Sequence, residues 1–248
     1  MRREIRIGLS LYSLSFVRTG SAFLDVMSGV AVAKHCGFHY IEIPYICGLS
    51  VLEVCRISNY SKQSGVCIYS VHLPKDLIDN ISRYNISEIK QFLSIIQPKI
   101  VVMHPAMNLN CTKVIDIAKN IVTLDMELSI ENIFSRQILK KLGFCDKRIG
   151  ITVDFHHTYR NGDTIEEMIQ TFSNQINHFH IRDYSSTSYK DYIPPGSGDL
   201  IITDILACIM QSAVYGCYIL ECPMKSINEV SETKALLDEM ISVATLIS

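Results

Sequence analysis

The sequence predicts an α/β fold in which eight strand–helix units close into a parallel barrel. Its 248 residues are about the length typical of one such barrel. Short apolar runs alternate along the chain with longer segments that have helical periodicity. This alternation favours a parallel sheet, because each strand needs a crossover connection to reach the next one. We therefore expect a single (β/α)8 TIM barrel domain over residues 1–248.

Eight apolar runs are typical of strands that are buried on both faces. The first is IRIGLSLYS, near the N-terminus. The others, in order, are YIEIPY, CIYSVHLP, IVVMHP, LSIENI, ITVDFHH, HFHIRDY and YILECP. Segments with helical spacing follow these runs and cover residues 23–37, 49–65, 86–98, 111–125, 134–143, 163–175, 203–216 and 228–247. In the sixth of these segments, Asp163 is expected to be the N-cap and Glu166 to complete a capping box.

Polar side chains stand at the ends of seven of these strands. They are Glu42, His72, His104, Glu131, Asp154, His180 and Glu221. The C-terminal ends of the strands form the active-site face of a parallel barrel. We therefore expect these groups to converge on one cavity at the mouth of the barrel.

Four of these residues come from the fifth to the eighth strand, which are neighbours in a closed barrel. They are Glu131, Asp154, His180 and Glu221. Three carboxylates and one imidazole suit Mn²⁺, Co²⁺, Zn²⁺ or Mg²⁺. Without a cation, three carboxylates so close together would repel one another, and some would have to be protonated. The sequence therefore predicts one divalent metal at this position.

Three further histidines near the mouth are candidates. For His72 and His104, a second metal or substrate role and a purely structural role are both open, so a second ion is part of the prediction. His157 lies three residues after Asp154 and is expected to point back over the cavity. His156 should alternate away from it and be structural.

Two residues are expected to lie near the cavity without being ligands. Glu42 would line the cavity or hold a salt bridge at the barrel floor, and we assign it a supporting role. His178 shares a strand face with His180 by the period of two, but it should lie deeper in the barrel, so we leave it out of the predicted site.

Composition narrows the class of protein. The net charge of −2 provides no electrostatic drive toward nucleic acid, which is therefore not the expected partner. No run of about 18 apolar residues is present, so no membrane span is expected. Nine cysteines without a paired spacing indicate reduced thiols and a cytoplasmic protein. An oligomer is compatible with the sequence.

The ordered motifs IEIPY, SVHLP, VVMHP, SIEN, VDFHH, HFHIRD, PPGSGDLI and YILECP carry a family resemblance. Together they resemble the xylose isomerase-like TIM-barrel superfamily, and the resemblance covers nearly the whole chain. That superfamily includes sugar and sugar-phosphate isomerases and epimerases, hydroxypyruvate isomerase, inosose dehydratases and endonuclease IV. The motif series is specific for the superfamily and weak for any one of these activities.

The resemblance to the sugar epimerases implies roles for individual residues. One divalent metal would be held by Glu131, Asp154, His180 and Glu221. Glu131 and Glu221 would also act as an acid/base pair, working through a metal-stabilised enediolate of a small sugar, sugar phosphate or hydroxy-ketone. His157 and Arg182 match substrate-binding positions, and Arg182 would either orient a substrate anion or pair with Asp183.

The resemblance to endonuclease IV implies an alternative, a metal-dependent phosphodiester hydrolase. In that pattern His72 and His104 would join Glu131 around one zinc ion. A third zinc ion would need an Asp-x-His segment and a loop glutamate. Here Lys190 and Tyr192 stand at the Asp and His positions and Ser197 replaces the glutamate, so the third zinc site is broken.

Two other readings stay open. An inosose-type dehydratase is a neighbour of the epimerase, because the same enediolate can expel a β-hydroxyl. A metal-bound barrel that binds a ligand or partner without catalysis is compatible with the fold. Against this last reading, a binding protein has no need of both glutamates.

Overall fold

Eight parallel strands form a closed barrel in the computed structural model, which describes residues 5–105, 120–121, 125–142, 148–187 and 193–248. Each strand pairs with the next along the chain, and β1 pairs with β8. The strands are β1 Arg6–Ser10, β2 Tyr40–Pro44, β3 Cys67–His72, β4 Ile100–Met103, β5 Glu127–Glu131, β6 Ile149–Asp154, β7 Ile176–Ile181 and β8 Cys217–Leu220. The predicted fold class and the predicted strands are confirmed.

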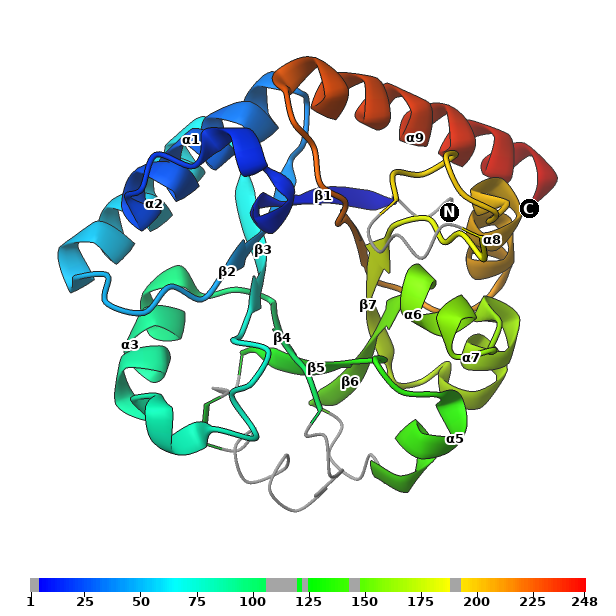
Figure 1. Cartoon of the computed structure of the whole chain (residues 1–248), viewed down its shortest axis with the longest axis horizontal. Helices are drawn as coiled ribbons and strands as arrows, with labels where there is room; N and C mark the ends of the chain where they lie inside the picture. The colour runs from blue at the N-terminus through cyan, green and yellow to red at the C-terminus, as the bar shows by residue number, and fades with distance from the viewer. Residues whose placement is uncertain (1–4, 106–119, 122–124, 143–147, 188–192) are drawn as a thin grey trace.

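Helices surround the barrel, as the view down its axis shows (Figure 1). They are α1 Ala22–His35, α2 Val51–Ser64, α3 Ile86–Ile96, α5 Arg136–Leu139, α6 Phe155–Arg160, α7 Ile165–Phe172, α8 Ile202–Gln211 and α9 Ile227–Ile247. Short 3-10 turns, η1 Leu11–Ser13, η2 Ser15–Val17, η3 Ile81–Arg83 and η4 Lys140–Leu142, lie in the connections. Most of the helix predicted over residues 111–125 lies outside the described residues.

The start of α7 differs from the prediction by one residue. Thr164, not Asp163, is the N-cap, and its hydroxyl accepts a hydrogen bond from the backbone N–H of Glu167. Glu167, not Glu166, completes the capping box by accepting from the backbone N–H of Thr164. Asp163 is engaged elsewhere, because its carboxylate accepts from the backbone N–H of Arg136 at 2.7 Å. The prediction was wrong because local spacing does not reveal this long-range partner.

Helix α6 was not predicted, and it shapes the site. It begins directly after β6, and the Asp154 carboxylate caps it by accepting a hydrogen bond from the backbone N–H of His157 at 2.8 Å. A carboxylate at a helix N-terminus satisfies an otherwise unpaired N–H group and complements the helix dipole. The first turn therefore holds His157 close to the end of β6.

Most of the apolar core lies between the strands and the surrounding helices, where β-branched side chains such as Ile41, Ile130 and Val153 are fully buried. A small second cluster, contributed mainly by β3, β4 and β8, includes Tyr69 and Ile219. The Tyr69 ring stacks on His178 of β7 with centroids 6.0 Å apart, so this apolar cluster meets polar groups within the barrel. None of the helices in the described part of the chain is both long and apolar enough to cross a membrane.

Candidate metal centre

The four predicted metal ligands meet at one end of the barrel. Glu131 ends β5, Asp154 ends β6, His180 is the penultimate residue of β7, and Glu221 directly follows β8. The pairing register places Asp154 beside His180. All four side chains are buried, and one ligand atom from each lies within 4.8 Å of the others.

His180 is at the centre of this group. Its Nδ1 lies 3.1 Å from Glu131 Oε1, 3.1 Å from Glu221 Oε2 and 4.0 Å from Asp154 Oδ2. One ring nitrogen therefore faces three carboxylates, each from a different strand end. The other nitrogen, Nε2, points toward Glu42.

Two carboxylate oxygens in the group indicate that it suits a cation. Asp154 Oδ2 and Glu221 Oε2 are buried and accept no well-aligned hydrogen bond from the described residues. Their close contacts are ion pairs, with Arg182 Nε at 2.7 Å and with His180 Nδ1 at 3.1 Å. Leaving such oxygens without a full set of partners is costly in a protein interior. Carboxylate oxygens and an imidazole nitrogen are ligands that suit first-row divalent metals and Mg²⁺. The residues therefore fit a divalent cation held by Glu131, Asp154, His180 and Glu221.

A second set of imidazoles surrounds Glu131. Its Oε2 lies 2.6 Å from His104 Nε2 and 3.3 Å from His72 Nε2. Both histidine side chains are 12% exposed, whereas Glu131 is 2% exposed, so they lie nearer the solvent. The same three residues form a group with the donor types for a second cation.

Opposite charges set the protonation of this cluster. Burial by itself raises the pKa of Glu131, but the imidazoles of His104, His180 and His72 outweigh burial and hold this pKa well below its usual range. Burial likewise opposes the charged form of His180, but Glu42, Glu221 and Glu131 raise its pKa well above the ordinary value. Without a metal, a proton on His180 therefore supplies the positive charge between the carboxylates.

Arg182 and His157 lie on another side of the group. Arg182 is 1% exposed, and its Nε lies 2.7 Å from Asp154 Oδ2. Its Nη2 donates to His157 Nε2 at 2.9 Å. Burial lowers the pKa of His157, which keeps that ring neutral and able to accept. The carboxylate beside Arg182 is thus Asp154, and the predicted substrate contacts of Arg182 and His157 remain predictions.

Asp183, the other partner considered for Arg182, organises a loop instead. Its Oδ2 accepts hydrogen bonds from the backbone N–H groups of Gly196 and Gly198, both at 2.9 Å. Its Oδ1 accepts from Tyr184 and Leu200. Asp183 therefore binds the loop that includes Ser197. Lys190 and Tyr192, which bear on the endonuclease IV comparison, lie outside the described residues.

Sequence reasoning missed two polar residues that support the group. Asn132 accepts a hydrogen bond from the backbone N–H of Asp154 at 2.7 Å and thereby joins the ends of β5 and β6. Ser70 donates to Glu42 Oε2 at 2.8 Å. The period of two along β3 would have placed Ser70 on the same face as His72, which is the signal that could have found it.

Two residues expected near the cavity lie at its base. Glu42 and His178 are buried inside the barrel, and both contact the imidazole ring of His180. His178 precedes His180 by two residues on β7, and the two rings lie 5.4 Å apart between their centroids. His156 is buried against the rings of His157 and Tyr184.

Comparison with known proteins identifies the fold. No family model and no curated protein sequence matches the chain. Among solved structures, it is similar to a xylose isomerase domain protein from Alicyclobacillus acidocaldarius, with a TM-score of 0.75 and 14% identity over 98% of this chain and 100% of that one. A D-tagatose 3-epimerase-like protein has a TM-score of 0.75 and 18% identity over 97% of this chain and 98% of that one.

The 3-keto-D-glucoside 4-epimerase of E. coli is a further similar structure, with a TM-score of 0.70 and 14% identity over 96% of this chain and 100% of that one. These neighbours match the superfamily that the strand-end motifs resemble. At such low identity they show that the chain shares their TIM-barrel fold.

Proposed function

We propose that this protein is a divalent-metal-dependent isomerase or epimerase of a small sugar, sugar phosphate or related hydroxy-ketone. The observation that carries the proposal is the convergence of Glu131 and Glu221 on His180 Nδ1, each at 3.1 Å. Two glutamates beside one cation site provide an acid and a base for moving a proton next to a carbonyl. The names of the epimerases with the same fold support this choice of reaction class.

The cation would be held by Glu131, Asp154, His180 and Glu221. When bound, it would supply positive charge that offsets the negative charge developing on the substrate oxygens. Asp154 is preorganised for this role, because its Oδ1 is occupied by the backbone N–H of His157 while Oδ2 faces the group.

Proton transfer would be carried by the two glutamates. Glu131, whose pKa is held well below its usual range, would be the ionised base that takes the proton from the carbon next to the carbonyl. The C–H electron pair would form the carbon–carbon double bond of the enediolate, and the carbonyl electron pair would move onto oxygen. Glu221 would be ionised at rest, because His180 and Arg182 outweigh burial and lower its pKa. It would take up a proton from solvent and then return that proton to the opposite face for epimerisation or to the adjacent carbon for isomerisation.

Histidines at the mouth would assist the base. The rings of His72 and His104 lie edge to face with centroids 5.1 Å apart, and both rings reach Glu131 Oε2. Contact with Glu131 raises the pKa of His72 against the opposing effect of burial. These imidazoles would stabilise the ionised form of Glu131 and share the proton that it removes.

The test is exchange of substrate hydrogen with solvent. Protein with a measured metal content, loaded with Mn²⁺, Co²⁺, Zn²⁺ or Mg²⁺, would be incubated in D₂O with a panel of ketoses and ketose phosphates and followed by proton NMR. We expect a substrate that loses its signal next to the carbonyl. The variants Glu131→Gln and Glu221→Gln should slow this exchange by at least about 100-fold.

Glu127→Gln is the matched control. Glu127 begins β5, the strand that Glu131 ends, and it pairs with Lys99 at 2.7 Å, away from the metal group. This variant should exchange substrate hydrogen as fast as the wild type. Absence of exchange across the whole panel, in protein shown to carry the metal, would contradict the proposed reaction.

A further inference from the structure

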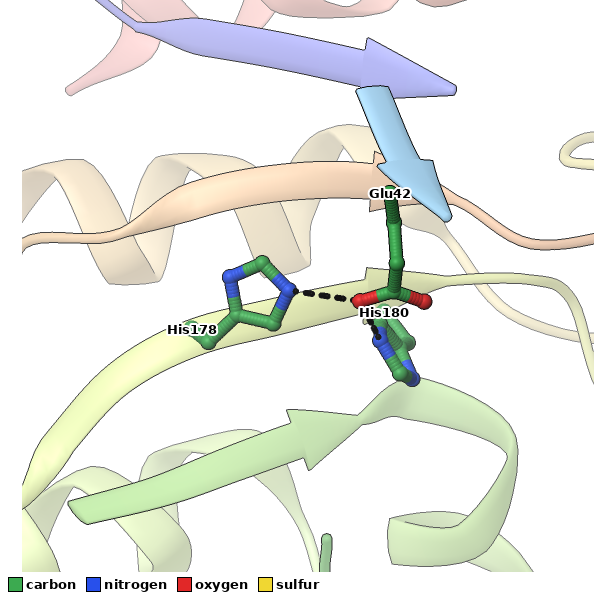
Figure 2. A group of neighbouring side chains, drawn as sticks. All are labelled: Glu42, His178 and His180. Carbon is green, nitrogen blue, oxygen red and sulfur yellow. Dashed lines mark hydrogen bonds and ion pairs between the residues drawn. The ribbon is translucent and has the colours of Figure 1, made fainter. Parts of the chain in front are cut away.

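Glu42, His178 and His180 form a buried polar cluster, which shares His180 with the proposed metal ligands (Figure 2). Glu42 of β2 extends across the barrel interior, and its Oε2 lies 3.3 Å from His178 Nε2 and 3.3 Å from His180 Nε2. Ser70 Oγ donates to the same oxygen at 2.8 Å. The side chains of Glu42, His178 and His180 are at most 2% exposed.

His180 belongs both to this buried cluster and to the proposed metal site. Its Nδ1 faces Glu131 and Glu221, while its Nε2 faces Glu42. A neutral imidazole has one N–H group, and a nitrogen that binds a metal must carry none. If Nδ1 binds the cation, the proton of His180 therefore has to be on Nε2. There the Glu42 carboxylate can accept a hydrogen bond from the Nε2–H group.

Glu42 is suited to accept this hydrogen bond because its carboxylate is buried and held in place by Ser70 on one side and His178 on the other. Ser70 is the register partner of Glu42 on the neighbouring strand, so the backbone fixes the Ser70 donor beside the carboxylate.

His178 anchors the same carboxylate from the other side. A hydrogen bond from an imidazole to a carboxylate needs an N–H group on the ring. Its Nδ1 has no hydrogen-bond partner among the described residues, whereas its Nε2 lies within reach of Glu42. The proton is therefore on Nε2. Stacking on Tyr69 with an interplanar angle of 9° holds the ring in the orientation that donates to Glu42.

We propose that Glu42 is a positioning residue for the metal centre: it fixes the tautomer and ring orientation of His180 so that Nδ1 presents its lone pair to the cation, with Ser70 and His178 holding the Glu42 carboxylate. Carboxylates that accept the second N–H of a metal-bound histidine act in this way in other metal sites. The inference rests on the proposed function, because it assigns Glu42 a part in the metal site described there.

The first readout is zinc affinity, measured by competition with a chromophoric chelator. Glu42→Leu removes the acceptor, and zinc binding should weaken by about 10- to 100-fold. Glu42→Gln keeps an acceptor oxygen without the charge, so its affinity should lie between those of Glu42→Leu and the wild type. Ser70→Ala, which removes only one support of Glu42, should have a smaller effect, and Glu127→Gln should bind zinc like the wild type.

The second readout is the nitrogen spectrum of His180 in ¹⁵N-histidine-labelled protein, assigned with His180→Asn. In the zinc-loaded wild type, Nε2 should carry a proton that is shifted downfield and protected from exchange, while Nδ1 is metal-bound. Glu42→Gln should lose the downfield shift. A simple packing role for Glu42 would not move this proton signal.

The outcomes separate this inference from the proposed function. Wild-type zinc affinity and an unchanged His180 signal in both Glu42 variants would overturn the positioning role alone. A second zinc ion that is lost in Glu42→Gln would overturn it too, because Glu42 would then be a ligand and the His180 ring a bridge. A wild type that binds no divalent cation would overturn the proposed function and the positioning role with it.

Discussion

Arg182 and Asp154 form an ion pair in the interior of the barrel, with Nε 2.7 Å from Oδ2 and both side chains at most 2% exposed. Asp154 is thus shared between a permanent cation, the guanidinium, and the position proposed for the metal. The negative charge of Asp154 is therefore balanced by the Arg182 guanidinium even before a metal binds.

The stability of the metal-free protein should therefore depend on Arg182. Replacing it with Met leaves the Asp154 carboxylate buried without its guanidinium, and breaking a buried pair from one side costs about 3–5 kcal/mol. Urea unfolding of metal-free Arg182→Met should show this loss, and saturating zinc should restore part of it. Lys99→Met is the control. Its side chain is 54% exposed, so the loss there should stay within about 1 kcal/mol.

Metal stoichiometry should be one ion per chain. Glu131, Asp154, His180 and Glu221 form the group with four ligating residues, whereas His72 and His104 share Glu131 with that group. Elemental analysis of protein purified without chelators should give one divalent ion, and Glu131→Ala should lose it. Two ions per chain, with one lost in His104→Ala, would instead show that His72 and His104 are metal ligands. Phosphodiester hydrolysis would then be the favoured reaction.

Metal binding should release protons and weaken in acid. Acidic neighbours outweigh burial and raise the pKa of His180, so a proton on Nδ1 competes with the cation for this nitrogen. Below that pKa, the affinity for zinc should fall about tenfold per pH unit for each proton released. Calorimetry in buffers of different ionisation enthalpy counts these protons. Zinc affinity that stays constant from pH 6 to 8 would contradict the assignment.

Protection of the backbone amides in the loop after β7 should depend on the Asp183 carboxylate. Asp183→Ala leaves the backbone N–H groups of Gly196, Gly198, Tyr184 and Leu200 without this acceptor. Hydrogen exchange at these amides should become faster, because their protection comes from the carboxylate. Asp199→Ala offers the comparison. Asp199 accepts from the exposed Ser186, and its loss should leave the amides of Gly196 and Gly198 protected.

Local sequence carried the prediction of the strands and of the metal group. The runs that contain Ile130 and Val153 are apolar and β-branched, and these residues are buried in the structure. Glu131 and Asp154 stand at the ends of these runs, and a parallel barrel places such ends on one face. Their convergence could therefore be predicted without any knowledge of the tertiary contacts.

The partners of individual atoms could not be predicted in this way. The Asp163 carboxylate binds Arg136 rather than capping its own helix, and Arg182 contacts Asp154 rather than its sequence neighbour Asp183. A side chain has several candidate partners of suitable charge along the chain. The packing of elements that are distant in sequence decides which of them it meets.

Order along the chain therefore accounts for the barrel and for the donor types at its mouth, because periodicity and strand-end position are local properties. The partners of the two ring nitrogens of His180 are decided only in the assembled barrel. Nδ1 meets Glu131 at the end of β5 and Glu221 directly after β8, while Nε2 meets Glu42 from β2 across the interior. Closure of the sheet brings these strands around one imidazole, and the low dielectric of the interior gives each contact its effect on charge.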